Sequence, residues 1–317
     1  MTQVSFTPIP TPSMARRRIV CAAGAAMLLG GGCRTGGGDQ DNDRRMESQP
    51  EAGPLNLPDR VAGRPRIAWV LSSGGPRGFV HVGVLKGLSA LGLQPDFIVG
   101  ASVGAVVGTL WAAGLHMRLI EERALDLQPW DVLRPGFQSG VWLSGGGLAA
   151  LINDSLGGRL LQDLPIPMAC VAIRLADGEV VAFTRGDAGL AVQASSAIVG
   201  QLAPVQISGK AYADADQNTP LPVRLAHRLG ANRVLAVDAS AHEDRAPPSA
   251  QRYREADLRK RAATRLDSPL ADVLIHPDTG YWTGWSRAYR ERLIALGEAA
   301  VMAQEGALIK LHSRISR

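Results

Sequence analysis

The chain has 317 residues, of which 46% are hydrophobic, so it can bury the core of one α/β domain and still carry terminal segments. Its net charge of +5 does not indicate a nucleic-acid partner, because acidic residues interrupt the densest basic stretch, Arg252–Arg265, as on a solvated helix face. The three cysteines exclude a disulfide framework, since Cys170 has no partner once Cys21 and Cys33 serve in an export segment.

The first 33 residues have the pattern of an export signal. Arg16-Arg17-Arg18 precedes a short apolar stretch, Ile19–Gly32, which is too short to span a bilayer comfortably. Small residues before Cys33 resemble the cleavage site of bacterial lipoproteins, where the cysteine is lipidated. We therefore predict a signal over residues 1–33, a lipid anchor on Cys33 and a place on a membrane of the bacterial cell envelope, at its periplasmic face. The alternative is an ordinary signal with a coincidental cysteine.

Residues 34–64 have the composition of a flexible tether. The segment is rich in Gly, Asp, Asn, Pro and Glu and contains few apolar residues, so it cannot bury a core of its own. We predict that it joins the anchor to one folded domain over residues 65–312.

An uncharged stretch of 18 residues, Ile98–Leu115, has the length of a membrane span. Its glycines at 100, 104 and 108 have the fourfold spacing of glycine-mediated pairs of membrane helices. The flanking residues favour a different structure, because Pro95 and Asp96 open a short β-branched run. A strand, a sharp turn and a buried helix explain the same residues, and we predict these.

The first part of the domain is predicted to alternate strands and helices. Arg66–Leu71 is an apolar run, typical of a buried parallel strand, and Phe79–Leu91 has apolar residues at helical spacing. The next strand is expected at Asp96–Val99 and the next helix at Val103–Leu115. This order places loops at the carboxyl ends of the strands, where open α/β sheets hold their sites.

Four further strands and one helix are expected toward the C-terminus. Pro167–Ile173 and Glu179–Phe183 flank a short Asp-Gly turn and predict a hairpin. Arg233–Asp238 and Ala271–His276 have the composition of buried strands. Ser286–Leu311 is predicted as one helix, with its two glycines as weak points.

The residues Gly100-Ala101-Ser102-Val103-Gly104 form a Gly-x-Ser-x-Gly motif between a predicted strand and a predicted helix. In a nucleophile elbow, glycines flank the serine because the strained turn brings the backbone and its neighbours close together. The turn also puts the hydroxyl at a helix N-terminus, whose free N–H groups favour developing negative charge. Ser102 is therefore the candidate nucleophile, and Gly100 and Gly104 are the elbow glycines.

A second glycine-rich segment, Gly74-Gly75-Pro76-Arg77-Gly78, follows the preceding strand. Unobstructed backbone N–H groups in such a loop can hold the oxyanion of a tetrahedral intermediate, and one such donor contributes about 3–4 kcal/mol. The segment matches neither the dinucleotide fingerprint nor the P-loop. A plain tight turn is the alternative to an oxyanion loop.

In order and spacing, these two motifs resemble the opening of the patatin-like phospholipase family, with Arg77 at the basic position of the family's loop. The resemblance continues through Ser195–Gly200 and Tyr212–Asp214 and covers about Pro65 to Leu311. It implies a three-layer α/β domain, with a central, mostly parallel sheet flanked by helices. It implies no particular oligomeric state.

The resemblance also implies a chemistry. The family hydrolyses acyl esters with a Ser-Asp dyad, without histidine, metal or cofactor, and passes through an acyl-enzyme. Here the dyad would be Ser102 and Asp214, and Asp214 would accept the serine proton. The implied substrate is a membrane lipid or a lipid-like ester.

Several positions depart from the family pattern. Asp214-Ala215-Asp216 replaces Asp-Gly-Gly, so Ala215 is expected to strain the loop, and Asp216 is an alternative base. Ser73 stands where many members have glycine, and Val199 stands where proline is usual. A catalytically weakened or inactive envelope lipoprotein that acts as an interaction scaffold is therefore the alternative function.

Two other enzyme classes also use a serine elbow. A histidine triad would use Ser102 with Asp214 or Asp238 and His276, but the glycine loop lies too close to the elbow for an α/β-hydrolase. Acyl-carrier transacylases usually place a histidine before the serine, where this chain has Ala101. We expect no metal site, because no histidine pair has metal-ligand spacing with a Glu between. The aromatic residues Tyr281, Trp282 and Trp285 are expected either to touch lipid or to pack at the edge of the domain.

Overall fold

The computed structural model describes residues 49–59, 64–138 and 140–313. The predicted signal over residues 1–33 and the predicted lipidation site, Cys33, lie outside the described residues.

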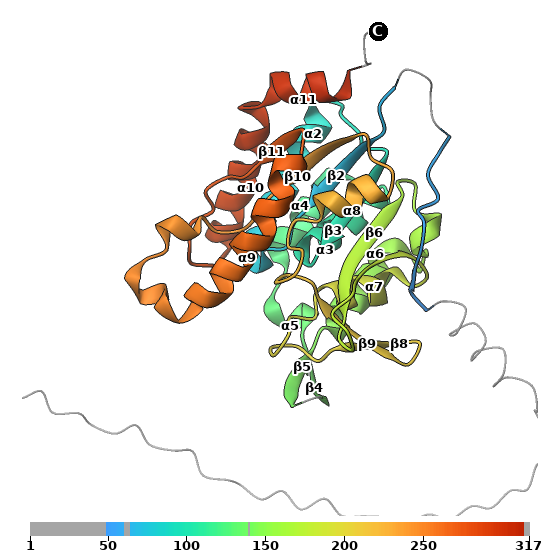
Figure 1. Ribbon diagram of the computed structural model, residues 1–317, viewed down its shortest axis with the longest axis vertical. Helices are drawn as coiled ribbons and strands as arrows, with labels where there is room; N and C mark the ends of the chain where they lie inside the picture. The colour runs from blue at the N-terminus through green and yellow to red at the C-terminus, as the bar shows by residue number, and fades with distance from the viewer. Residues whose placement is uncertain (1–48, 60–63, 139, 314–317) are drawn as a thin grey trace, which may run out of the picture.

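Within the described ranges, nine strands form one sheet in the order β1-β7-β6-β3-β2-β10-β11, with β9 paired to β6 and β8 paired to β9 (Figure 1). The five strands from β6 to β11 run parallel to one another, and the β1, β7, β8 and β9 pairings are antiparallel. A separate hairpin, β4–β5, projects from one end of the molecule. The strands are β1 Glu51–Ala52, β2 Ile67–Leu71, β3 Phe97–Ala101, β4 Arg134–Gln138, β5 Val141–Ser144, β6 Met168–Arg174, β7 Val180–Arg185, β8 Val205–Ile207, β9 Lys210–Asp214, β10 Arg233–Val237 and β11 Val273–Ile275.

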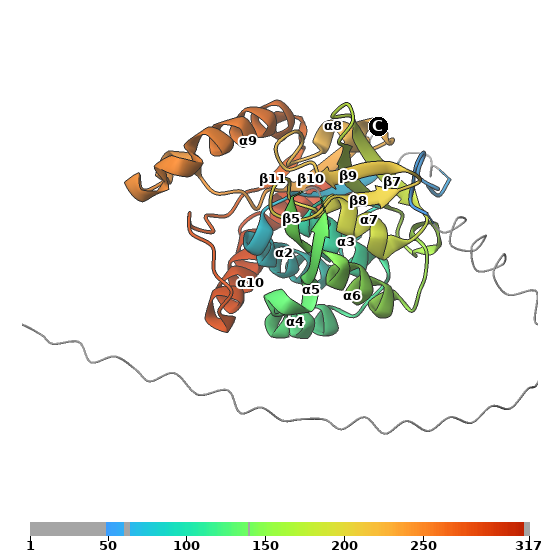
Figure 2. The ribbon, with the colours of Figure 1, turned by 90° about the horizontal axis from the view of Figure 1, so that it is seen from below.

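Helices cover both faces of the sheet, which gives the three layers that the sequence predicted. In Figure 2, α8 and α9 lie on one side of the sheet and α2, α3, α4, α6 and α10 on the other. The helices are α2 Phe79–Ala90, α3 Val103–Ala112, α4 Met117–Asp126, α5 Pro129–Val132, α6 Gly146–Leu156, α7 Ala188–Ser195, α8 Val223–Arg228, α9 Arg254–Asp267, α10 Arg287–Met302 and α11 Glu305–His312, with short 3-10 turns at Gly75–Gly78, Leu161–Asp163, Glu243–Arg245, Pro248–Tyr253 and Ser268–Leu270.

The central strands are hydrophobic on both faces because each face packs on helices. In β2, Ile67, Trp69 and Leu71 join the larger hydrophobic cluster, with α2, α3, α4, α6, α7, α10 and α11. Ala68 and Val70 point the other way, into the cluster that includes α8. All five residues are buried, so the predicted buried parallel strand is confirmed.

The uncharged stretch Ile98–Leu115 forms the end of β3, a sharp turn and the buried helix α3, as predicted. No helix within the described residues is both long and apolar enough to span a membrane. The predicted hairpin is also present, as the antiparallel pair β6–β7.

Residues 49–59, which the sequence analysis assigned to the tether, lie on the domain instead. Their strand β1 pairs with the edge strand β7, and Leu55 and Leu57 pack against the smaller hydrophobic cluster. The Arg66 guanidinium also donates to the Pro58 carbonyl oxygen at 2.7 Å. The composition of residues 34–64 as a whole is polar, so it did not reveal the contribution of these two leucines. The edge strand β7 has unpaired backbone groups, which can pair with the N-terminal arm formed by residues 49–59.

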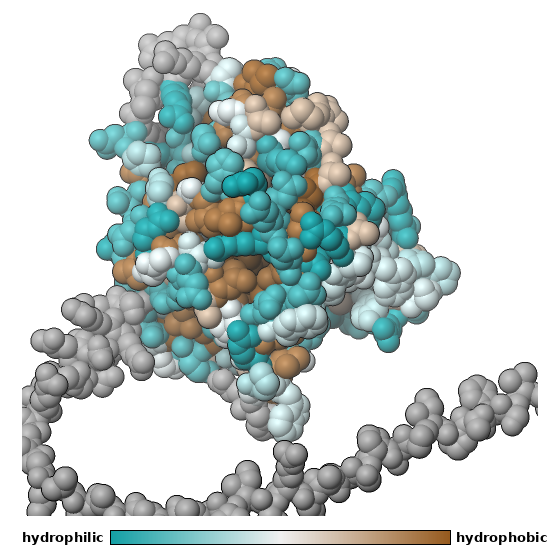
Figure 3. Space-filling view, turned by 180° about the vertical axis from the view of Figure 1, so that it is seen from behind, coloured by the Kyte–Doolittle hydropathy of each residue, from teal (hydrophilic) through white to brown (hydrophobic). Residues whose placement is uncertain are grey.

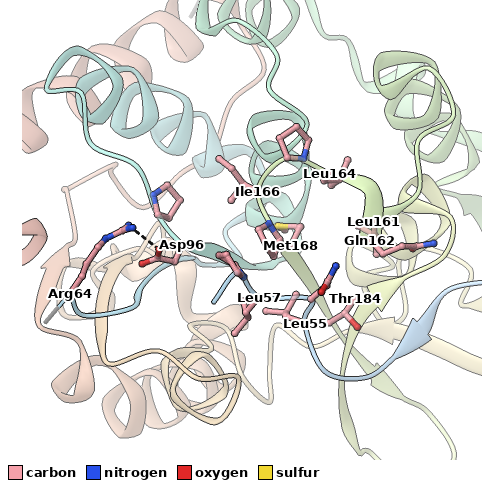
Figure 4. A pocket seen from close by; sticks show the side chains of 15 residues that line it. Leu55, Leu57, Arg64, Asp96, Leu161, Gln162, Leu164, Ile166, Met168 and Thr184 are labelled. Carbon is pink, nitrogen blue, oxygen red and sulfur yellow. Dashed lines mark hydrogen bonds and ion pairs between the residues drawn. The ribbon is translucent and has the colours of Figure 1, made fainter. Parts of the chain in front are cut away.

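A cavity of roughly 520 Å³ lies between this arm and the amino ends of β3 and β6 (Figure 4). Leu55 and Leu57 of the arm and Met168 of β6 are among its lining residues. An ion pair of 2.8 Å between Arg64 and Asp96 borders it. The cavity therefore opens at the end of β3 opposite to the predicted nucleophile.

The C-terminal segment forms two helices, so the prediction of one helix was wrong. The helices α10 and α11 are separated at Ala303 and Gln304, and the Gln304 amide donates to the Leu274 carbonyl oxygen at 3.2 Å. The turn lets α11 bury Leu308 and Leu311. Gly297 is not a weak point, because a Cβ there would lie 2.3 Å from the Val80 carbonyl oxygen of α2.

The close packing of α2 on α10 generates a stability prediction. A Cβ at Gly83 would stand 1.9 Å from the Ile294 carbonyl oxygen, whereas one at Gly306 meets no atom within 4 Å. We expect Gly83→Ala to lower the free energy of unfolding by about 1–3 kcal/mol, because the helices must separate. Urea denaturation measures the change, and Gly306→Ala is the matched control, expected to lose none. Equal midpoints for both variants would contradict the packing argument.

Candidate active site

Ser102 is the single residue between β3 and α3, and its backbone is strained. Its φ of 53° and ψ of −123° lie in a region that residues with a side chain rarely adopt. A Cβ at Gly100 would stand 2.6 Å from Ala105 Cα, and one at Gly104 would stand 2.1 Å from the Leu71 carbonyl oxygen. The turn therefore requires glycine at both elbow positions.

A buried serine on another helix holds the elbow in place. The Ser102 backbone N–H donates to Ser195 Oγ at 2.9 Å, and the Ser195 hydroxyl donates to the Val171 carbonyl oxygen at 2.5 Å. The elbow is thus tied to α7 and β6 through one side chain. Ser195 lies in a segment that resembles the family, but its role was not predicted, because no local pattern in the sequence marks a contact over 93 positions.

Asp214 reaches Ser102 because β6 continues beyond the end of β3. The last residue of β3, Ala101, lies opposite Val171 of β6, and the next residue, Ala172, lies opposite Asp214 of β9. β9 thus pairs with the same edge of β6 just past the elbow. The Ser102 hydroxyl hydrogen-bonds to the Asp214 carboxylate, and both side chains are buried.

The surroundings of Asp214 make its carboxyl an unusually strong base for an aspartate. Burial, assisted by the negative charge of Asp216, raises the pKa of Asp214 from 3.8 to about 7. The hydrogen bond from Ser102 and the positive charge of Lys260 oppose this rise. A base with a pKa near 7 is half deprotonated at neutral pH and well matched to proton transfer.

Asp216 has partners of its own. Its backbone N–H donates to Asp214 Oδ1 at 2.9 Å. Its carboxylate accepts a hydrogen bond from the Ser73 hydroxyl and forms an ion pair with Lys260 of α9. Two of the departures from the family pattern, Ser73 and Asp216, therefore contact each other. We name these three residues, Ser73, Asp216 and Lys260, the carboxylate bridge.

Ala215 does not strain the loop, contrary to the expectation from the sequence. Among the non-glycine residues that the structure describes, only Ser102 and Ser208 have positive φ. The Ala215 side chain is buried in the smaller hydrophobic cluster. Its methyl group therefore fills core space at a position where the backbone does not demand glycine.

The glycine-rich loop lies against the elbow. Gly75 has a φ of +54°, in the left-handed region. A Cβ at Gly78 would stand 2.3 Å from the Val103 side chain, and one at Gly74 would stand 2.9 Å from Ala239 Cβ. The loop can therefore pack directly on the first turn of α3 and on Ala239 only because Gly78 and Gly74 lack side chains.

Arg77 binds a neighbouring backbone segment. Its Nε donates to the Gly280 carbonyl oxygen at 3.3 Å, and its Nη2 donates to the Tyr281 carbonyl oxygen. Its guanidinium also lies 6.0 Å from the centre of the Tyr281 ring. Arg77 therefore braces the glycine loop against residues 280–281.

His81 supports the loop from below as a neutral imidazole. Burial lowers the pKa of His81 to about 4, and its Nε2 contacts the Ser72 carbonyl oxygen at 2.9 Å. The Ser72 hydroxyl in turn accepts a hydrogen bond from the Ala239 N–H at 2.8 Å. His81 is thus a core residue that fixes the end of β2.

The histidine of the alternative triad has other partners. His276 Nε2 lies 3.8 Å from Asp238 Oδ2 and 3.4 Å from Ser240 Oγ, and its ring stacks on His242 at 4.0 Å. The contact with Asp238 is one that the alternative triad requires, but Ser102 is not among these partners, so the triad lacks its nucleophile. No group of three His, Cys, Asp or Glu side chains in the described part of the chain is placed to hold a metal ion.

An apolar cavity of roughly 240 Å³ opens beside Ser102. Its walls come from α2, α3, α4, α5, α6 and the connecting segments beside them, and Figure 3 shows apolar side chains in the middle of the face behind the view of Figure 1. Trp285, which the sequence placed either against lipid or at the domain edge, lines this cavity and packs edge-on against Phe79 at 6.1 Å. The other lining residues include Val82, Val106, Val107, Leu110, Ile120, Leu127, Leu148, Leu151, Ile198 and Leu202.

The family model of patatin-like phospholipases matches residues 69–227, which is half of the chain and includes Ser102, Asp214 and the glycine loop. An uncharacterized NTE family protein of Mycobacterium bovis is 36% identical over 193 residues, which cover 60% of this chain and 53% of the relative. Neuropathy target esterase sws of Drosophila melanogaster is 26% identical over 56% of this chain and 13% of its own length. The chain thus spans about half or less of these curated relatives.

Solved structures with a similar arrangement include VipD from Legionella pneumophila and a human GIVD cytosolic phospholipase A2. VipD has a TM-score of 0.48 and 15% identity over 82% of this chain and 70% of VipD. The phospholipase has a TM-score of 0.42 and 14% identity over 80% of this chain and 60% of its own.

The pKa of Asp214 generates a prediction about the reactivity of Ser102. Labelling of Ser102 by a fluorophosphonate should speed up as pH rises, with a midpoint near 7, because the deprotonated Asp214 accepts the serine proton. Asp216→Asn removes a charge that raises this pKa, so the midpoint should move to lower pH. Mass spectrometry of the intact protein from about pH 5 to about pH 9 measures the rates.

The control is Glu305→Gln, which removes an exposed carboxylate on α11 and should leave the midpoint unchanged. A midpoint that stays fixed in Asp216→Asn would show that Asp214 does not activate Ser102.

Proposed function

Since the chain belongs to the patatin-like phospholipase family, we propose that it hydrolyses acyl esters of lipids with Ser102 and Asp214 as a catalytic dyad. One observation carries the proposal: the Ser102 hydroxyl sits on a buried carboxylate whose pKa is about 7, at the mouth of an apolar cavity. A nucleophile, a matched base and a place for an acyl chain thus meet at one point.

In the first half of the reaction, the Asp214 carboxylate accepts the Ser102 proton and Ser102 Oγ attacks the ester carbonyl carbon. We propose that the backbone N–H groups of Gly75 and Val103 receive the oxyanion, whereas Pro76 has no N–H to offer. Val103 opens α3, so its N–H has no acceptor within the helix. Asp214 then returns the proton to the leaving alcohol, and the acyl group remains on Ser102.

In the second half, a water molecule attacks the acyl carbon and gives its proton to Asp214. The tetrahedral intermediate collapses, the proton returns to Ser102 Oγ, and the fatty acid leaves. The same carboxylate thus acts as base and acid in both halves, and no histidine is required.

The cavity indicates the chemical class of the acyl group. Its walls are almost entirely aliphatic and aromatic, and they begin at Ser102 itself. Such a pocket gains free energy from burying methylene groups, at about 0.8 kcal/mol for each. We therefore propose a fatty acyl ester, in which the chain enters the cavity and the polar alcohol stays outside.

Replacement of the nucleophile tests the proposed chemistry. Ser102→Ala should lower the rate of p-nitrophenyl butyrate hydrolysis at least about a thousandfold, because no other group can form the acyl-enzyme. Ser89→Ala changes an exposed serine of α2 and should retain full activity. Retained activity in Ser102→Ala would refute the proposal. A folded wild-type protein that neither hydrolyses esters nor reacts with fluorophosphonate would instead favour the scaffold function.

We also propose that Cys33 carries a lipid that holds the enzyme on a membrane of the bacterial cell envelope, at its periplasmic face. The proposal is supported by the small residues before Cys33 and the basic and apolar residues upstream. In cells of a bacterial host, Cys33→Ala should move the protein from the detergent phase to the aqueous phase of a Triton X-114 separation. Cys21→Ala is the matched control. If the wild-type protein partitions into the aqueous phase, it carries no lipid.

A further inference from the structure

Four large hydrophobic side chains are exposed on two segments that border the apolar cavity and on strand β5, which is hydrogen-bonded to one of them. Trp130 of α5 is 69% exposed and Trp142 of β5 is 73% exposed. Leu143 of β5 and Val199, in the loop after α7, are 41% and 55% exposed. We call these four residues the hydrophobic rim. A monomeric protein in water rarely gathers two exposed indole rings on neighbouring elements without a use for them.

The rim is continuous with the wall of the cavity. Pro129 and Leu133, which flank Trp130 closely in sequence, line the cavity, and so do Ile198 and Leu202 around Val199. The same two segments therefore present one set of side chains to the cavity and another to solvent. A molecule that touches the rim lies at the entrance to the chamber beside Ser102.

Hydrogen bonds hold the backbone segments that carry the rim residues. The Ala203 N–H donates to the Leu143 carbonyl oxygen at 2.8 Å, which joins the loop after α7 to β5. The Arg134 guanidinium donates to the carbonyl oxygens of Trp130 and Leu133 at 2.8 and 2.9 Å. These bonds fix the backbone that carries the indole of Trp130.

The cavity decides which occupant fits the rim. The proposed substrate is a lipid, which must leave its own phase and enter the cavity without crossing water. A protein partner bound to the rim would cover the entrance to the cavity, whereas a bilayer would supply lipid substrate directly to that entrance. Tryptophan also prefers the interface between membrane and water, because its apolar ring contacts lipid there while its N–H stays hydrated.

We propose that the hydrophobic rim docks the enzyme on a lipid bilayer, with Trp130 and Trp142 in the interfacial layer and the cavity facing the acyl chains. This surface rests on the proposed lipid substrate. Figure 1 shows β4–β5 at the end of the molecule opposite α11, so α11 faces away from the bilayer. The rim orients the active site on the surface, a task separate from the attachment that a lipid on Cys33 would provide.

Vesicle binding by an inactive, unlipidated protein tests the rim without requiring catalysis. The full chain with Cys33→Ala and Ser102→Ala is the parent, and co-sedimentation with phosphatidylcholine vesicles gives its affinity. Adding Trp130→Ser and Trp142→Ser should weaken binding at least about tenfold, because two interfacial side chains are lost. Ile309→Ser, which changes a residue of α11 that is 50% exposed, should leave binding unchanged.

Two further readouts separate docking from folding and chemistry. Far-UV circular dichroism and the unfolding midpoint confirm that the double variant is folded, and Val199→Ser offers a milder change on the rim. In the Ser102 enzyme, the double variant should hydrolyse p-nitrophenyl butyrate as before but lose activity on vesicle phospholipid.

The outcomes are distinct. Equal vesicle binding by the parent and the double variant would overturn the docking proposal. The parent could instead bind no vesicles and form a dimer that the double variant does not form. That result would assign the rim to contact with a second copy of the chain, and it would also overturn the docking proposal. An inactive Ser102 enzyme whose rim variants still lose vesicle binding would refute only the proposed hydrolysis and would support the docking surface.

Discussion

The pairing of two strands on one edge of β6 is the constraint on which the site depends. β3 occupies that edge up to Ala101 opposite Val171, and β9 occupies it from Asp214 opposite Ala172. Asp214 and the residue before the nucleophile, Ala101, therefore lie opposite consecutive residues of β6, although 112 positions separate Ser102 from Asp214 in sequence. A strained turn is acceptable at Ser102 because the sheet fixes both sides of it, while the two elbow glycines make room for α3.

The electrostatics of the site follow from this burial. An aspartate in water is too acidic to accept a serine proton efficiently, and burial removes that obstacle by disfavouring the charged form of Asp214. The carboxylate bridge acts on the pKa of Asp214 in both directions. It brings a second negative charge, Asp216, near the base, but it also brings Lys260 and the Ser73 hydroxyl, which neutralise and bind that charge. The pKa of Asp214 is thus about 7, close to neutral pH.

Local motifs were readable from the sequence, and long-range contacts were not. The central strands and the turn from β3 through Ser102 into α3 are each specified within a few residues, so these predictions hold in the structure. The strand pairing that brings Asp214 to Ser102, the support from Ser195 and the ion pair from Lys260 join segments far apart in the chain. Two leucines redirected residues 49–59 from tether to sheet edge, and the burial of Leu308 and Leu311 required a break before α11. Neither the pairing of residues 49–59 with the sheet edge nor the break before α11 can be predicted from composition and helical periodicity alone.

The carboxylate bridge also constrains how such a site can have arisen. Asp216 placed beside Asp214 without Ser73 and Lys260 would be a second carboxylate with neither a hydrogen-bond donor nor a cation, and it would push the pKa of Asp214 further upward. Ser73 and Lys260 without Asp216 would be a small hydroxyl and a surface ammonium, each tolerable alone. Evolutionary descent from the glycine-containing pattern is therefore easiest if the serine and the lysine came first and the aspartate last. Among homologues, an aspartate at this position should accompany both partners, while the partners can occur without it.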